Sequence, residues 1–116
     1  MPGLPDVDFA VIEESKITHY LLAADHPVGR FKAAFFLGFG FGAAAWEELH
    51  DALLAHARDG QIVSVSETEF GIKYILEGPL SAPDGRRPNL RAVWFVEAGE
   101  RTPRLVTAYA MPRGGE

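Results

Sequence analysis

The sequence contains no cysteine. This absence excludes thiol chemistry, disulfide bonds and thiolate metal sites, and it fits a protein of the reducing cytosol. The first residues, Met1 to Asp6, lack both the basic patch and the apolar run of a secretory signal. The longest apolar stretch, Ala33 to Ala45, is interrupted by glycines and is too short to span a bilayer. From these absences we expect a cytoplasmic protein without a membrane segment.

Positive charge is also scarce. The chain has 11 Lys and Arg against 16 Asp and Glu, which gives a net charge of −5. Residues 1–60 hold four basic and nine acidic residues, whereas residues 61–116 hold seven of each. Nucleic-acid-binding modules are usually basic, so this balance counts against such a module.

Apolar residues are plentiful, at 47% of 116 residues. A chain of this size and composition can bury a core without disulfides or a metal. No internal repeat, low-complexity run or linker interrupts it. We therefore expect a single domain, residues 1–116, with an ordered core from about residue 9 to residue 111.

The hydrophobic pattern changes at Gly60. Apolar residues recur at helical spacing before this glycine and follow strand patterns after it. A short edge strand is expected at residues 9–12, and helices are expected at 13–24, 27–37 and 43–58. Strands are expected at 61–66, 70–77, 90–97 and 104–111. Because the loops between strands are too short for parallel crossovers, the sequence predicts an α+β fold, with about three N-terminal helices packed on a four-stranded antiparallel meander sheet. Between the two layers we expect a core that includes Phe35, Trp46, Leu53 and Trp94.

We expect neither a cofactor nor a metal ion. The glycine-rich segment Gly38–Gly42 resembles a phosphate-binding loop only superficially, because no strand precedes it and no Lys-Ser/Thr pair follows. His50 and His56 are six residues apart, so they cannot form a ligand pair on one helix face. The acidic residues of the helical half lack the other ligands of a metal centre, which favours solvated helix faces.

One candidate site lies around the start of the second helix. His26 stands where this helix begins, Arg30 and Lys32 follow within it, and Lys16 lies on the first helix. A helix N-terminus suits an anion such as phosphate, a histidine can move protons near neutral pH, and lysine can stabilise a pentavalent phosphorus. The alternative, which the pattern alone favours, is that His26 caps the helix and the cations are solvated.

A second candidate site lies on the last strand. Thr107 and Tyr109 share one face by alternation, whereas Arg104 starts on the opposite face. Lys73 and Arg91 lie on the neighbouring strands. These polar residues can line a cleft on the sheet, or they can form the solvated face of a half-covered sheet, which is the commoner case.

Several motifs can be compared with known families. They are residues 16–22 (KITHYLL), 26–33 (HPVGRFKA), 67–74 (ETEFGIKY) and 103–109 (PRLVTAY), together with Phe36, Gly38, Trp46, Leu49, Gly85, Arg86, Val93 and Trp94. Together they resemble an uncharacterised family of small bacterial domains over most of residues 9–110. Ala110 departs from the pattern, because a proline often follows the tyrosine in similar sequences.

Such domains look like distant members of the barnase–EndoU–colicin–RelE group of ribonuclease toxins. In that group helices precede a four-stranded antiparallel sheet, which is the order expected here. The resemblance implies a toxin–antitoxin operon or a toxin tip as the setting. Catalytic residues vary among the members of the group, so no catalytic role transfers by position.

Two hypotheses of function follow. The first is a metal-independent endoribonuclease, in which the ribose 2′-OH attacks the adjacent phosphate and His26 shuttles a proton, with RNA as substrate and a small antitoxin protein as partner. Its catalytic residues would be Lys16, His26, Lys32, Thr107 and Tyr109. Its substrate-binding residues would be Arg30, Lys73 and Arg104. The second hypothesis is a non-catalytic binding partner, such as an immunity or accessory protein, which the acidic charge favours.

Overall fold

The computed structural model describes residues 3–22 and 30–111. The helical half begins with a 3-10 turn, η1 (Val7–Phe9), and a short helix, α1 (Glu14–Lys16), which continues as a π-helical turn, η2 (Ile17–Leu21). Then come α2 (Arg30–Gly38), the 3-10 turn η3 (Ala43–Ala45) and α3 (Trp46–Asp59). The expected end of the first helix and the expected start of the second lie outside the described residues. None of the described helices is long and apolar enough to cross a membrane.

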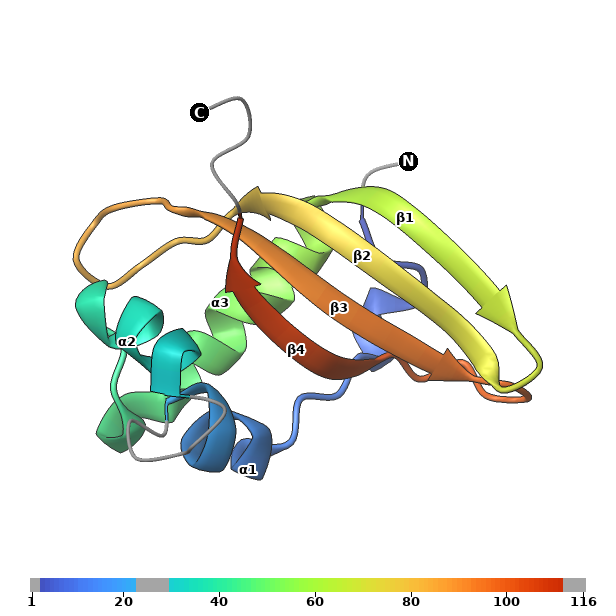
Figure 1. Cartoon of the computed structure of the whole chain (residues 1–116), viewed down its shortest axis with the longest axis horizontal. Coiled ribbons are helices and arrows are strands. Elements are labelled where there is room, and N and C mark those ends of the chain that lie inside the picture. Colours follow the sequence, from blue (N-terminus) through green and yellow to red (C-terminus); the bar gives the residue numbers. More distant parts are fainter. Residues whose placement is uncertain (1–2, 23–29, 112–116) are drawn as a thin grey trace.

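Four strands follow the helices. They are β1 (Gln61–Thr68), β2 (Gly71–Pro79), β3 (Asn89–Glu97) and β4 (Arg104–Ala110). The strands pair in the order β1-β2-β3-β4, each antiparallel to the next. Figure 1 shows α3 crossing behind the strands, with α2 beside it. The predicted α+β fold with an antiparallel meander is therefore confirmed.

Helix α3 shows why the two halves pack together. Leu49, Leu53 and Ala57 recur every four residues and are all fully buried, because residues four apart share a helix face. On the sheet, every second residue of a strand points toward the helices. These buried sheet residues are Leu76, Leu90, Ala92, Trp94, Leu105 and Ala108.

The expected core residues fall into two groups. Leu53 and Trp94 are fully buried, as predicted, whereas Phe35 and Trp46 are partly buried and pack against the core. In α2 the fully buried aromatic residue is Phe36. The helix therefore turns Phe36 into the core and leaves Phe35 at its margin.

The two edges of the sheet differ. At the β4 edge, the Val11 N–H donates to the Pro103 carbonyl at 2.8 Å, and the Leu105 N–H donates to the Val11 carbonyl at 3.2 Å. The edge strand expected at residues 9–12 is thus reduced to one parallel bridge between Val11 and Arg104. At the other edge, no segment within the described residues pairs with the outer side of β1.

Candidate functional site on the open face of the sheet

The helices cover one face of the sheet, and the other face carries the predicted site residues of β2 and β4. We call this second surface the open face. On β2, β3 and β4 the register places these residues on it: Gly71, Lys73, Ile75, Glu77, Pro79, Asn89, Arg91, Val93, Phe95, Glu97, Arg104, Thr107 and Tyr109. The second candidate site of the sequence is therefore one continuous surface.

Arg104 lies on a different face of the sheet from the one that the sequence predicts. Simple alternation from Thr107 and Tyr109 puts Arg104 on the opposite face. Strand β4, however, contains an extra residue, Val106, at a register shift against β3. Such a β-bulge uses one residue without a partner, so that Leu105 is buried and Arg104 returns to the open face. The expectation that Arg104 starts on the opposite face is wrong.

A polar contact on the open face joins three strands. Arg91 lies directly opposite Glu77 on β2 and Tyr109 on β4. Its Nε donates to Glu77 Oε2 at 2.7 Å, and a second guanidinium nitrogen contacts the same oxygen. The Arg91 guanidinium carbon lies 6.0 Å from the centre of the Tyr109 ring. The hydrogen bond with Glu77, and then the one with Tyr109, raise the pKa of Arg91, which keeps a fixed positive charge on this surface.

A second group on the open face is centred on Phe95. This residue lies opposite Lys73 on β2 and Arg104 on β4, and both cations are exposed. Phosphates attract such cations, and nucleic acid bases stack on aromatic side chains. The open face therefore has the groups that a single-stranded polyanion with aromatic bases requires.

The remaining predicted site residues belong to the helical half. Lys16 ends α1 and is half-buried. Arg30 and Lys32 lie in the first turn of α2, and the structure does not describe their side chains. His26 lies outside the described residues. A position of His26 and Lys32 near Thr107 and Tyr109 stays a prediction.

His56, which the sequence analysis considered only as a metal ligand, lies beneath the sheet. It is 2% exposed, and its Nε2 is 2.9 Å from the Leu90 carbonyl oxygen. Burial lowers the pKa of His56, and hydrogen bonds with the Leu90 and Gly78 carbonyls offset this only in part. The buried, neutral imidazole therefore has a structural role. The sequence did contain a signal for this burial: His56 follows Leu49 by seven residues and Leu53 by three, which puts the three on one helix face.

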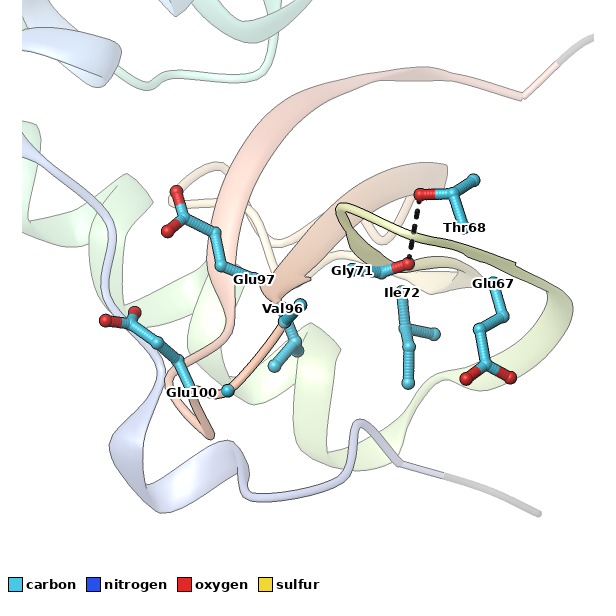
Figure 2. A pocket seen from close by; sticks show the side chains of 9 residues that line it. Glu67, Thr68, Gly71, Ile72, Val96, Glu97 and Glu100 are labelled. Atoms are coloured by element: carbon cyan, nitrogen blue, oxygen red, sulfur yellow. Dashed lines mark hydrogen bonds between the residues drawn. The ribbon is translucent and has the colours of Figure 1, made fainter.

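A pocket of about 290 Å³ lies where the β1–β2 and β3–β4 turns come together. Figure 2 shows Ile72 and Val96 in this pocket with the carboxylates of Glu67, Glu97 and Glu100 around them. We call this region the hairpin end. Three carboxylates repel phosphate, so the pocket does not suit RNA. In the part of the chain that the structure describes, no group of His, Asp and Glu residues is placed to hold a metal ion.

Comparison with known proteins gives a family and a fold. A family described as a domain of unknown function (DUF6883) matches residues 3–112. No curated protein matches the sequence. Among solved structures, one chain of a contact-dependent growth inhibition toxin–immunity protein complex from Klebsiella pneumoniae 342 has a TM-score of 0.71 and 17% sequence identity. The similarity covers 91% of this chain and 97% of that chain, and at this identity it establishes a shared fold.

Proposed function

The chain belongs to the DUF6883 family, and we propose that it is a toxin-like, metal-independent endoribonuclease that binds RNA on the open face. The observation that carries this proposal is the placement of Lys73 and Arg104 on either side of Phe95, with Arg91 further along β3 on the same face, on a surface that no described helix covers. The chain as a whole has a net charge of −5. Two exposed cations beside an aromatic ring on an otherwise acidic protein are groups that a polyanionic ligand with aromatic bases can bind.

The proposed reaction is attack of a ribose 2′-OH on the adjacent phosphate. Lys16, His26, Lys32, Thr107 and Tyr109 are the proposed catalytic residues, and Arg30, Lys73 and Arg104 are the proposed substrate-binding residues. Cations and hydroxyls that stabilise a pentavalent phosphorus must lie within a few ångströms of it. Thr107 and Tyr109 lie on the same face of the sheet as Lys73 and Arg104, which supports this assignment.

The proposed setting is the cytoplasm of a bacterium, with a small antitoxin protein as partner. The solved structure with the shared fold is part of a toxin–immunity protein complex, which supports a protein partner here as well. The shared fold supports the toxin role and the immunity role equally.

Expression in bacteria and cleavage of purified RNA test this proposal. We expect growth arrest, and cleavage that continues in excess EDTA. The double variant Lys73→Gln, Arg104→Gln should reduce kcat/KM by on the order of tenfold, because two phosphate contacts are lost. The control is Arg58→Gln, which removes an exposed cation that pairs with Asp8 away from the open face. A harmless wild type that leaves RNA intact would contradict the ribonuclease proposal.

One observation favours a second candidate, a non-catalytic binding partner such as an immunity or accessory protein. At the hairpin end Phe70, between the pocket residues Thr68 and Gly71, is 72% exposed, and Val65 on the edge strand β1 is 57% exposed. Exposed apolar side chains rimmed by charge are typical of protein-binding surfaces. If Phe70→Ser abolishes binding of a co-purifying protein while RNA stays intact with the wild type, this second function is the correct one.

A further inference from the structure

Two carboxylates, Glu77 and Glu97, lie on the open face, and the contacts of Glu77 with Arg91 fix its orientation. Both contacts from Arg91 go to the same oxygen, Oε2 of Glu77. Neither of these contacts involves the other oxygen, Oε1. The pair therefore fixes the direction of the carboxylate and leaves one oxygen able to accept a proton.

The surroundings of this pair are partly apolar. On the open face Glu77 and Arg91 adjoin Ile75 and Val93, which lie opposite each other on the same two strands. The Arg91 side chain is 30% exposed and the Glu77 side chain is 20% exposed. A half-buried charge interacts more strongly than a fully solvated one, and a ligand can still reach this one.

The third member of the group is Tyr109. Its ring lies 6.0 Å from the Arg91 guanidinium carbon. Arg91 thus stands between a carboxylate on one neighbouring strand and a phenol on the other. A base, a cation and an acid are the groups that cleavage of a phosphodiester requires within one site.

From this geometry we infer that Glu77 is the general base, and Arg91 the phosphate-stabilising cation, of a ribonuclease site on the open face. The ligand is an RNA phosphodiester with a free 2′-OH. This inference rests on the proposed function and assigns it two catalytic residues that the sequence analysis did not.

The proposed step is a single transesterification within the RNA. Glu77 Oε1 takes the proton of the 2′-OH while the 2′-oxygen forms a bond to phosphorus. Arg91 neutralises charge on the non-bridging oxygens. The bond from phosphorus to the 5′-oxygen breaks, and the Tyr109 phenol gives its proton to that leaving oxygen. The products are a 2′,3′-cyclic phosphate and a 5′-OH end, and solvent returns the proton from Glu77 to the Tyr109 phenolate.

A purely structural role for the pair is the competing explanation, because opposite charges directly across two strands stabilise a sheet. A charge swap separates the two roles. The double variant Glu77→Arg, Arg91→Glu restores an ion pair at the same register, so a structural pair should work in either direction. A general base and a phosphate-binding cation cannot exchange strands and keep their positions relative to Tyr109.

The experiment measures cleavage of a 5′-labelled single-stranded RNA oligonucleotide in EDTA, together with the thermal midpoint of each variant. We expect Glu77→Gln to lower kcat by on the order of a hundredfold or more with little change in KM. Arg91→Ala should lower kcat to a similar extent. The swapped variant should regain most of the thermal midpoint of wild type but none of its cleavage. A DNA oligonucleotide of the same sequence should stay intact, because it lacks the 2′-OH.

The matched control is Asp84→Asn, which disrupts the pair of Asp84 with Arg86 on the β2–β3 loop and should leave cleavage unchanged. If wild type cleaves RNA and Glu77→Gln or the swapped variant cleaves equally well, the inference is overturned and the ribonuclease function stands. If wild type itself cleaves no RNA, both are overturned together.

Discussion

The two faces of the sheet use the same strands for different purposes. On the helix side Leu76, Ala92 and Trp94 are completely buried. One position along, on the open face, stand Glu77, Arg91 and Phe95, which are only partly buried. Because successive side chains of a strand point to opposite faces, one strand supplies both core packing and surface chemistry. Substitutions at neighbouring positions should therefore affect different properties of the molecule.

The largest expected effect compares two adjacent aromatic residues of β3. Trp94→Ala should lower the free energy of unfolding by about 3–5 kcal/mol, as for other buried large residues. Phe95→Ala should cost less, about 1–2 kcal/mol, because the open face leaves its ring partly in water. Urea denaturation of both variants measures the difference. Equal losses would mean that the open face is as well packed as the helix side.

The next effect concerns the buried histidine of the helix side. Burial lowers the pKa of His56 below its usual value of 6.5, so the unfolded chain binds a proton more readily than the folded one. Stability is therefore complete above pH 6.5 and falls as the pH drops from there through the lowered pKa of the folded state, by at most about 1.4 kcal/mol per pH unit. Denaturation midpoints measured from about pH 8 to about pH 5 should show this fall.

His56→Gln is the control for that measurement. It removes the titrating group, so the fall below pH 6.5 should become shallower even though the variant is less stable throughout. An unchanged pH dependence would assign the effect to other groups.

A smaller effect is expected from the ion pair of the open face. Arg91→Ala should lower the free energy of unfolding by about 1 kcal/mol or less, since partly exposed pairs contribute little. The same change should abolish most of the proposed cleavage. A loss as large as that of Trp94→Ala would place Arg91 among the residues that hold the fold together.

The smallest effect is expected at an exposed cation. Lys73→Gln should change the free energy of unfolding by no more than about 0.5 kcal/mol. It should weaken RNA binding, and the salt dependence of that binding should become less steep. Fluorescence anisotropy with a labelled RNA at several salt concentrations measures both. An unchanged salt dependence would place the RNA elsewhere on the protein.

The fold could be predicted because its signals are local. Alternation identified the strands, and the shortness of their connections excluded parallel pairing. The choice between Phe35 and Phe36 could not be made in the same way. Both are apolar neighbours on one helix, and the rotation of α2 about its axis decides which of them faces the core. That rotation is set by packing against the sheet, so a short stretch of sequence does not reveal it.

The site was harder to predict because it depends on pairing between strands. The extra residue Val106 places Arg104 on the open face, and its sequence, a valine within an apolar strand, does not mark a bulge. The contact of Glu77 with Arg91 requires the register of β2 with β3. A site formed by side chains of paired strands can be recognised only when the register between those strands is known.

The bridge between Val11 and Arg104 has a consequence for how the chain is made. The segment from Gly3 to Val11 is held at both ends: the Leu4 N–H donates to the Ala57 carbonyl at 2.8 Å, and Val11 binds beside β4. On the ribosome this segment emerges long before β4 does. The β1–β2 hairpin can form during synthesis from neighbouring residues, but the β4 edge closes only when nearly all of the described chain has been translated. A nascent chain that stalls before Arg104 therefore leaves the β3 edge unpaired.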